Sequence, residues 1–224
     1  MISVVIPTLD EERYIAETIS SVKKAADIEV IVADGGSSDR TPEIAEQYAD
    51  KLVISEKGRG AQMNAGAANA EGESLLFLHG DTVLPENWDE LVKDVLKKSA
   101  DTLGAFRLAV KEKTIALNIM IFSANIRARI FSLPYGDQAL FLSRTLFDSI
   151  DGFKEIPLME DIEMVRMVKK IGKIKILNEP VVTSSRRWKK EGCFYSIARN
   201  QIFLFLYLIG IPAERLSRLY KVIR

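Results

Sequence analysis

Residues 2–12 read ISVVIPTLDEE, a short run of β-branched side chains followed by a proline and an acidic stretch. Ile15, Ile19 and Val22 come next at helical spacing, which predicts a helix over residues 11–26. The alternation continues through the first hundred residues, with further strands predicted at 28–32, 51–54 and 75–78 and further helices near Pro42, at 60–70 and at 87–98. Strands that alternate with helices indicate βαβ units, so we expect an α/β fold with a mostly parallel central sheet flanked by helices.

The second half of the chain follows a less regular pattern. It predicts strands at 103–110, 139–142, 174–177 and 181–183, and helices at 114–131, 160–172 and 191–208. No linker or repeat separates the two halves, and 224 residues suit one domain. We therefore expect a single domain over residues 1–224.

The bulk composition excludes several classes of protein. The chain has 31 Lys and Arg against 31 Asp and Glu, so it lacks the basic surplus typical of nucleic-acid binding. Cys193 is the only cysteine, which fits a reducing compartment. No basic leader precedes the first apolar run, and the strongest apolar run, 202–211, is shorter than the roughly 18 residues of a spanning helix. We expect a cytoplasmic protein.

In a parallel sheet, ligands bind where the strands end, which directs attention to the loops after residues 6, 32, 54 and 78. In the second loop, ADGGSSD, Asp34 could bond a base or a ribose hydroxyl, or could close a turn on its own backbone. In the third, Arg59 stands between glycines at a predicted helix start, a setting that suits a phosphate.

The fourth loop lies in residues 76–86, LFLHGDTVLPE. Here a predicted buried strand is followed by two side chains that could bind a ligand, His79 and Asp81. Asp81 is a hard oxygen donor suited to Mg²⁺ or Mn²⁺ that bridges to phosphates. His79 is the only histidine, and structural and ligand-binding roles both remain open for it. Either role leaves less negative charge at the metal than two carboxylates would.

Two later stretches carry further candidates. In PLMEDIEM, Glu160 and Asp161 begin a predicted helix, where they complement the helix dipole or place a general base in a cleft. In SSRRW, Arg186 and Arg187 form either a surface basic pair or two guanidiniums that face a diphosphate, and Trp188 suits a core position.

Together these stretches resemble one family. The chain is similar to the inverting family 2 glycosyltransferases of the GT-A fold, a Rossmann-like fold of nucleotide-diphospho-sugar transferases, and most to the small single-domain branch with His-x-Asp in place of Asp-x-Asp. The resemblance covers about residues 1–190 and rests on seven stretches in order: PTLDEE, VADGGSSDRT, GRGAQMNAG, FLHGDTVLP, PYGDQALF, MEDIEM and SSRRW. The glutamine that often precedes the Arg-Trp pair is absent.

The resemblance implies a role for each matching position. Asp161 matches the general base and Glu160 its neighbour, while Asp81 matches the ligand of a divalent metal, Mn²⁺ or Mg²⁺. The implied nucleotide-binding residues are Pro7, Thr8, Glu11, Asp34, Arg59, His79, Gly80 and Arg187, and the implied acceptor-binding residues are Asp137, Gln138 and Trp188. The resemblance also divides the chain into three parts: a nucleotide-binding part at 1–100, an acceptor part at 101–190 and C-terminal helices at 191–224.

The implied reaction is metal-dependent transfer of a sugar, with inversion, from a nucleotide-diphospho-sugar donor to an acceptor hydroxyl. Methyltransferases and dehydrogenases would need a glycine-rich turn after the first strand, where this chain has PTLDEE. A non-catalytic nucleotide-sugar-binding or partner subunit stays open as an alternative. The apolar helix at 194–208 either packs in the core or at a homodimer interface, or lies on a membrane and meets a lipid-linked acceptor.

Overall fold

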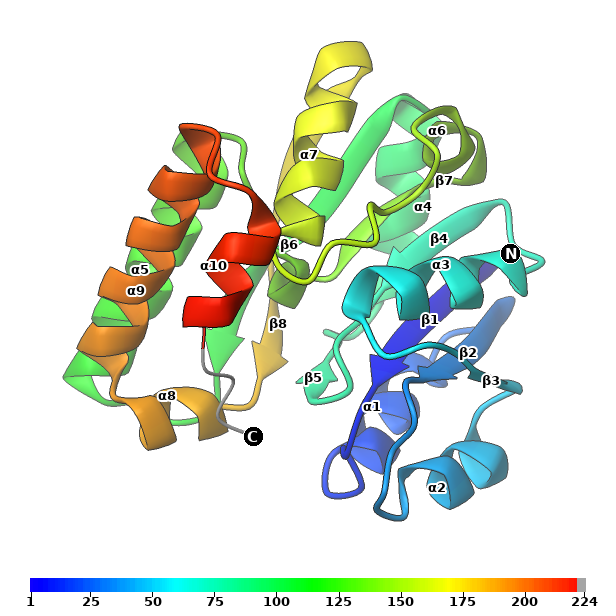
Figure 1. Ribbon diagram of the computed structural model, residues 1–224. Coiled ribbons are helices and arrows are strands. Elements are labelled where there is room, and N and C mark those ends of the chain that lie inside the picture. Colours follow the sequence, from blue (N-terminus) through cyan, green and yellow to red (C-terminus); the bar gives the residue numbers. More distant parts are fainter. Residues whose placement is uncertain (221–224) are drawn as a thin grey trace.

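A computed structural model describes residues 1–220, and for Arg187 it describes the backbone only. One eight-stranded sheet runs through the molecule in the order β3-β2-β1-β4-β7-β6-β8-β5, with helices on both faces (Figure 1). The strands are β1 (Ile2–Thr8), β2 (Ile28–Asp34), β3 (Lys51–Ile54), β4 (Ser74–Phe77), β5 (Thr82–Val83), β6 (Thr102–Val110), β7 (Leu140–Ser143) and β8 (Lys173–Thr183).

The helices follow the strands in the alternating order that the sequence predicts for the first half. They are α1 (Ile15–Val22), α2 (Thr41–Tyr48), α3 (Arg59–Ala68), α4 (Trp88–Lys98), α5 (Ile115–Ile130), the 3-10 turn η1 (Gly136–Gln138), α6 (Arg144–Ser149), α7 (Glu160–Ile171), α8 (Arg186–Glu191), α9 (Cys193–Leu208) and α10 (Ala213–Leu219). The α/β fold with its flanking helices is confirmed.

The sheet is parallel in its first half and mixed in its second. β1 pairs in parallel with β2 and β4, and β2 with β3. β7 then runs antiparallel between β4 and β6, while β8 returns parallel to β6. Because β1 is central, both of its faces are covered, and its β-branched residues are buried throughout.

Alternate residues of the strands feed two cores, one on each face of the sheet. Val4 and Ile6 of β1 pack with α1, α2 and α4, whereas Val5 between them packs with α3, α6 and α7. This period of two is what a strand buried on both faces requires. The two cores hold the sheet rigid, so the loops at the carboxyl ends of β1, β2 and β4 have fixed positions.

Several element boundaries differ from the sequence prediction. The strands expected at 174–177 and 181–183 are one strand, β8. Its pairing with β6 shifts register between Ala105, which pairs with Ile176, and Arg107, which pairs with Pro180. The helix expected at 191–208 begins after Gly192, whose positive φ of 84° turns the chain out of α8. The sequence analysis did not find the short elements β5, α6, α8 and α10. The division at residues 100 and 190 stays a prediction, and residues 221–224 lie outside the described part of the chain.

Candidate functional site

The loops after β1 and β2 are tied together through a buried carboxylate. Asp34 is 1% exposed, and its Oδ1 accepts a hydrogen bond of 3.0 Å from the Thr8 hydroxyl. Its Oδ2 accepts bonds of 2.9 and 2.8 Å from the backbone N–H groups of Gly36 and Ser37. This is the turn geometry that the sequence left open as an alternative. The backbone of residues 35–37, which Asp34 orders, is therefore better placed to meet a ligand than the Asp34 side chain.

The loop after β4 meets the loop after β1 at Gly80. The Thr18 hydroxyl of α1 donates a bond of 2.9 Å to the Gly80 carbonyl. A Cβ atom at position 80 would lie 3.1 Å from Cγ of Glu11 and 3.3 Å from Cγ2 of Thr8. Only glycine allows this approach without displacing its neighbours. Glu11 and Asp81 therefore lie at the same edge of the sheet.

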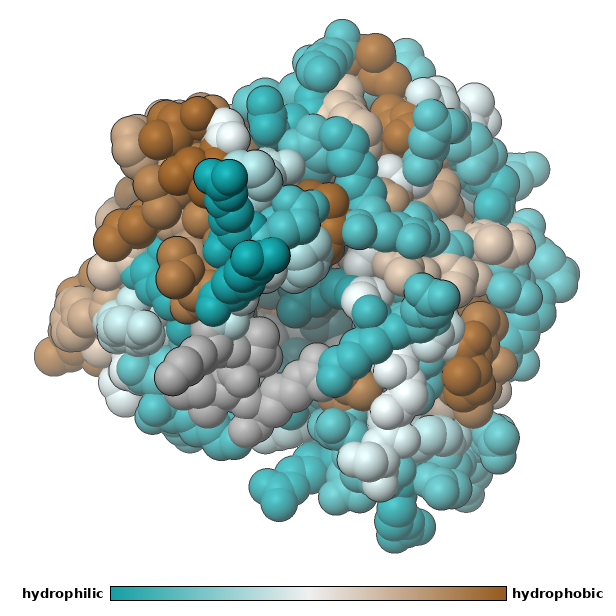
Figure 2. Space-filling view, viewed as in Figure 1, coloured by the Kyte–Doolittle hydropathy of each residue, from teal (hydrophilic) through white to brown (hydrophobic). Residues whose placement is uncertain are grey.

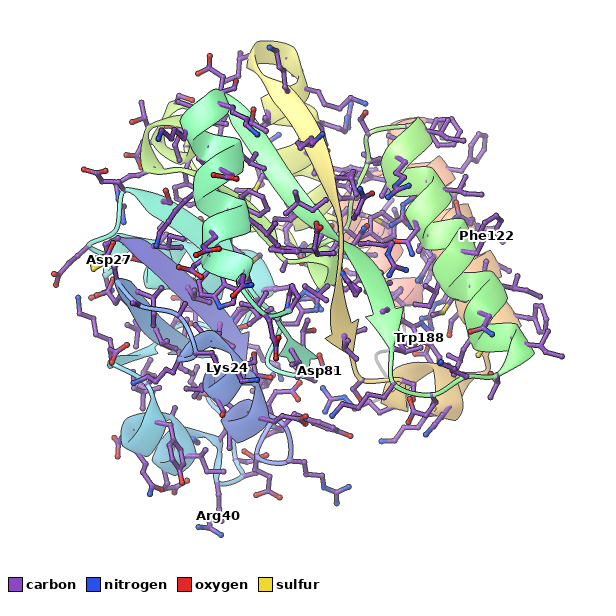
Figure 3. The ribbon with its side chains drawn as sticks, turned by 180° about the vertical axis from the view of Figure 1, so that it is seen from behind. Lys24, Asp27, Arg40, Asp81, Phe122 and Trp188 are labelled. Atoms are coloured by element: carbon purple, nitrogen blue, oxygen red, sulfur yellow. The ribbon has the colours of Figure 1, made fainter. Side chains whose placement is uncertain are left out.

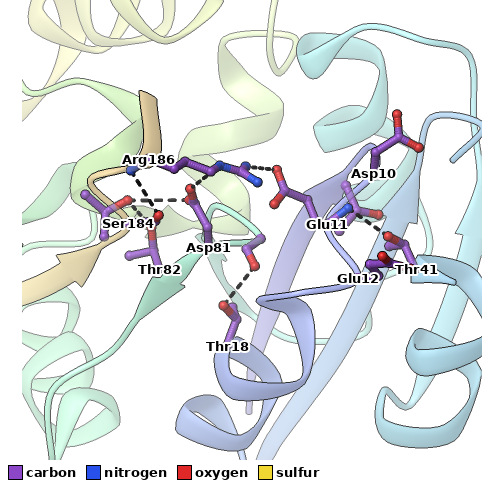
Figure 4. Close-up of polar contacts among 12 residues, drawn as sticks. Asp10, Glu11, Glu12, Thr18, Thr41, Asp81, Thr82, Ser184 and Arg186 are labelled. Carbon is purple, nitrogen blue, oxygen red and sulfur yellow. Dashed lines mark hydrogen bonds and ion pairs between the residues drawn. The ribbon is translucent and has the colours of Figure 1, made fainter. Parts of the chain in front are cut away.

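Arg186 joins these two acids. Its guanidinium pairs with the Glu11 carboxylate, and its Nε lies 3.4 Å from Oδ2 of Asp81 (Figure 4). The Thr183 hydroxyl donates a bond of 3.4 Å to Oδ1 of Asp81. Burial raises the pKa of Asp81, and the positive charges of Arg186 and Arg59 oppose that rise. Asp81 is thus a desolvated carboxyl that a nearby cation stabilises.

The residues around Asp81 fit a metal that is shared with a substrate. Among residues 1–220, no group of three or more His, Cys, Asp or Glu side chains is placed to hold a metal ion. Mg²⁺, however, is commonly held by one or two carboxylates together with substrate phosphates and water. Asp81 supplies one such carboxylate in a buried setting, so the donor set fits a metal that a diphosphate helps to bind.

The start of α7 reaches the end of β4 through Gly136 in η1. The Gly136 N–H donates a bond of 2.7 Å to Oδ2 of Asp161, and the Ile162 N–H donates one of 2.7 Å to Oδ1. A Cβ atom at position 136 would lie 3.1 Å from Nε2 of His79 and 3.4 Å from Oδ2 of Asp161. His79 and Asp161, which are far apart in the sequence, therefore lie close together on either side of Gly136.

A second link joins the starts of α3 and α7. Nη1 of Arg59 lies 3.2 Å from Oε1 of Glu160, which is 4% exposed. Burial raises the pKa of Glu160, while Arg59 lowers it and the neighbouring Asp161 raises it further. A Cβ atom at Gly60 would lie 2.6 Å from the Lys154 carbonyl, so the two segments are in direct backbone contact.

Two residues assigned to the acceptor side lie in the interior. Gln138 is 0% exposed, and its Nε2 donates a bond of 2.9 Å to the Phe106 carbonyl. Trp188 packs against Leu117 and Met120 of α5. Both side chains contact their own chain, and their assignment to the acceptor side stays a prediction. Asp137 and Pro7 are half-buried. The predicted role of Arg187 falls on a side chain outside the described residues.

Two residues that shape the site, Gln62 and Arg127, were not identified from the sequence, and Arg186 was identified there as half of a basic pair. Arg186 contacts both acids of the first and fourth loops. Gln62 of α3 donates bonds of 2.6 and 3.0 Å to the carbonyls of Thr8 and Ala33, the ends of two strands. Arg127 stacks 3.2 Å from the ring centroid of Tyr135, whose pKa burial raises to about 12. Nothing in the local sequence distinguishes a buried Arg127 from a surface arginine.

Solved structures with this fold are glycosyltransferases. TarS residues 1–349 from Staphylococcus aureus, in complex with UDP-GlcNAc, matches with a TM-score of 0.65 and 20% identity, over 96% of this chain and 69% of that chain. Glucosyl-3-phosphoglycerate synthase from Mycobacterium tuberculosis, in complex with Mn²⁺, UDP and glucosyl-3-phosphoglycerate, matches with a TM-score of 0.67 and 19% identity, over 95% and 81%. At these identities the likeness establishes the GT-A fold.

Curated relatives agree with the structural match. The chain is 34% identical over 109 residues to the poly(ribitol-phosphate) β-N-acetylglucosaminyltransferase TarS of S. aureus strain Mu50, over 44% of this chain and 18% of that protein. It is 29% identical over 167 residues to a PGL/p-HBAD biosynthesis glycosyltransferase of M. tuberculosis strain H37Ra, over 67% and 62%. The chain thus spans less than two thirds of these relatives.

The family model for glycosyl transferase family 2 matches residues 3–153. This region holds the loops after β1, β2 and β4 and the Gly136 segment, but it ends before Glu160 and Asp161. The roles that the resemblance implies for those two acids therefore stay predictions. Because the match covers more than half of the chain and agrees with the fold, the protein belongs to glycosyl transferase family 2.

Proposed function

We propose that the protein transfers a sugar from a nucleoside-diphosphate sugar to an acceptor hydroxyl, with inversion at the anomeric carbon. Family membership supports glycosyl transfer, and the fold relatives were solved with UDP-GlcNAc, with UDP and Mn²⁺, and, for a Pyrobaculum calidifontis mannosyltransferase, with GDP-Man and Mn²⁺. The nucleobase, the sugar and the acceptor are left open in this proposal.

One observation carries the assignment of roles. Gly136 brings Asp161 beside His79 at the end of β4, two residues from Asp81. An acid that could take a proton therefore lies at the same end of β4 as an acid that could hold a metal and a diphosphate. Inverting transfer needs both on opposite faces of the sugar, because the base acts on one face and the leaving group departs from the other.

The residues of this chain would divide the reaction as follows. Asp161 takes the proton of the acceptor hydroxyl as its oxygen forms a bond to the anomeric carbon. The bond from that carbon to the diphosphate oxygen breaks, and the diphosphate leaves with the electron pair. A divalent metal held by Asp81 would supply positive charge to the leaving diphosphate. Arg186 lies beside Asp81 and adds a second positive charge there.

Glu160 and Arg59 would support this chemistry without exchanging protons with the acceptor. Arg59 reaches the first turn of α7 from the first turn of α3, so it fixes the position of Asp161 relative to the third loop. Two backbone bonds orient the Asp161 carboxylate, because the Gly136 N–H donates to Oδ2 and the Ile162 N–H donates to Oδ1. His79 lies next to Gly136, as Asp161 does, so it would line the same part of the site as the proposed base.

The test measures turnover with a panel of UDP-GlcNAc, UDP-glucose and GDP-mannose in the presence of Mn²⁺. We expect release of nucleoside diphosphate from at least one donor, and loss of at least a hundredfold in Asp81→Ala and in Asp161→Asn. Asp94→Asn on the exposed face of α4 is the matched control and should retain full activity. Full activity in both site variants would refute the residue roles. Tight donor binding by calorimetry without turnover would favour a nucleotide-sugar-binding subunit instead.

A further inference from the structure

The molecule carries an apolar surface that the proposed reaction does not use. It is formed by outward side chains of α5 and α9; Phe122 is 67% exposed and Phe205 is 62% exposed. We call this surface the α5/α9 face. Its exposed members are Ile115, Ile119, Phe122, Ile126, Ile130 and Phe131 around α5, and Phe194, Tyr195, Ile202, Phe205, Leu208 and Ile209 around α9. Isolated exposed apolar residues are ordinary, but a contiguous group of this size marks an interaction site.

The two helices form a single face because they pack side by side. The inner side of α5, with Leu117 and Met120, contacts Trp188 of α8 and the first turns of α9. Figure 1 shows α9 lying over α5 at one end of the molecule, away from β3. Figure 2 shows brown side chains along that edge, and Phe122 points into solvent in Figure 3. With about 1.5 Å of rise per residue, α5 alone gives the face a length of roughly 24 Å.

The segments around the α5/α9 face carry more cations than anions, although Lys111 pairs with Glu17 and Lys189 with Glu112. Residues 111–131 and 186–220 together hold eleven Lys and Arg against three Asp and Glu, while the whole chain is neutral. Exposed cations stand next to exposed apolar members in the sequence, as Arg129 does beside Ile130. Lys113 and Lys190 precede the exposed starts of α5 and α9. The face is therefore apolar at its centre and basic at its rim.

Two charged residues within the two helices, Arg127 and Arg199, are turned away from the face. Arg127 of α5 is buried against Tyr135. Arg199 of α9 is buried as well, and its Nη2 lies 2.6 Å from Oε2 of Glu191. Arg199 therefore adds no charge to the face, because an internal ion pair neutralises it. The exposed cations are Arg129 in α5 and residues of the flanking segments.

The apolar centre and basic rim distinguish between the two partners that the sequence left open, a second copy of the chain and a membrane. A second copy of the chain would bring two basic rims together, and like charges across an interface oppose association. An anionic lipid surface satisfies the apolar centre and the basic rim at once. Among residues 1–220, no helix has both the length and the apolarity to cross a bilayer. We propose that the α5/α9 face lies on an anionic membrane surface without crossing it.

Docking would also place the candidate site near the membrane. α8 begins with Arg186, which contacts Glu11 and Asp81, and continues through Trp188 into the packing under α5. A lipid-linked acceptor could then present its hydroxyl to Asp161 from the bilayer. This step rests on the proposed function, whereas binding of the face to lipid does not.

The experiment is flotation of the protein, without donor or metal, with vesicles of 70% phosphatidylcholine and 30% phosphatidylglycerol, and with pure phosphatidylcholine. We expect binding to the anionic vesicles that weakens on going from 50 to 500 mM salt, because salt screens the rim. Phe122→Ser with Phe205→Ser should lower the partition coefficient more than tenfold. Lys113→Gln with Lys190→Gln should lower it about 25-fold, since each basic residue near such a surface contributes about fivefold.

Matched controls separate the face from general surface effects. Ile54→Ser with Ile171→Ser removes two exposed apolar residues elsewhere, and Lys97→Gln with Lys98→Gln removes two exposed cations of α4. Both controls should bind vesicles like the unaltered protein. No flotation of the unaltered protein with anionic vesicles would overturn the proposal. So would a stable dimer in analytical ultracentrifugation that Phe122→Ser with Phe205→Ser dissociates while leaving vesicle binding intact. Because no donor is present, neither result depends on the proposed reaction.

Discussion

The ion pair between Arg59 and Glu160 allows a test of how the two halves of the site are held together. Glu160 is buried at the start of α7, and Nη1 of Arg59 from α3 lies 3.2 Å from its carboxylate. Arg59→Met removes the positive charge but keeps much of the apolar stem. Glu160→Gln removes the negative charge and keeps the shape. The two changes and their combination form a double-mutant cycle that isolates the pair.

The size of the coupling follows from the exposure of each partner. Removing one partner of a fully buried pair costs about 3–5 kcal/mol, because the other charge is left without compensation. The Arg59 side chain is 48% exposed, so water screens its half of the pair. We therefore expect a coupling energy of about 1–2 kcal/mol, between the values for exposed and buried pairs.

The coupling should depend on pH with a definite sign. Burial raises the pKa of Glu160 above its ordinary value of 4.5, and Arg59 opposes that rise. In Arg59→Met the pKa of Glu160 therefore rises further. A carboxyl whose pKa is higher in the folded state than in the unfolded state destabilises the fold as pH rises above the unfolded value. The free energy of unfolding lost in Arg59→Met should thus be small near pH 4.5 and should increase as the pH rises.

The assay is urea unfolding of the four proteins at pH 4.5 and at pH 8. We expect a coupling of about 1–2 kcal/mol at pH 8 and less than about 0.5 kcal/mol at pH 4.5. The exposed pair of Lys111 and Glu17 is the control, and its coupling should stay below about 0.5 kcal/mol. A coupling for Arg59 and Glu160 below about 0.3 kcal/mol at pH 8, or one of equal size at both pH values, would refute this reasoning.

Three further changes probe the fold around the site. Gly104→Ala would place Cβ 2.0 Å from Cζ of the buried Phe141, so urea unfolding should show a loss of about 2–3 kcal/mol; no loss would mean that the ring can move. Asp34→Asn removes acceptors from the loop after β2 and should cost about 1.5–3 kcal/mol in the same assay, while an unchanged midpoint would contradict the proposed ordering of the loop. Bonds from Lys189 lower the pKa of Glu112 to about 2, so Glu112→Gln should cost under about 1 kcal/mol above pH 4.5, and this cost should disappear in thermal melts as pH falls toward 2.

The first half of the fold was predictable because its signals are local. Each strand of β1 to β4 is a short apolar run with a helical period after it, and sequential βαβ units pair in parallel. The place of β7 was not predictable, since Leu140–Ser143 inserts between β4 and β6 and runs against both. That order depends on which edge of the sheet is free, and no residue of β7 encodes it. Short helices such as α6 and α8 carry too few turns to show a period.

The candidate site divides in the same way. The convergence of the loops after β1, β2 and β4 follows from the rule for parallel sheets, and hydrogen bonds from Thr8 and Thr18 to these loops agree with it. Gln138 and Trp188 were assigned to the acceptor side because the resemblance implies that role. Their burial depends on β6 and α5, which the motifs do not describe.

The contacts that complete the site come from backbones in close approach. Cβ atoms at Gly60, Gly80 and Gly136 would lie 2.6, 3.1 and 3.1 Å from atoms of other segments of the site. Gly80 joins the first and fourth loops, Gly60 joins α3 to the segment before α7, and Gly136 joins His79 to Asp161. A side chain at any of them would push apart two segments whose acids act on one substrate in the proposed reaction. The spacing of the acids therefore depends on these three glycines as much as on the acids themselves, and that explains why a list of acidic motifs could name the residues of the site but could not show which of them face each other.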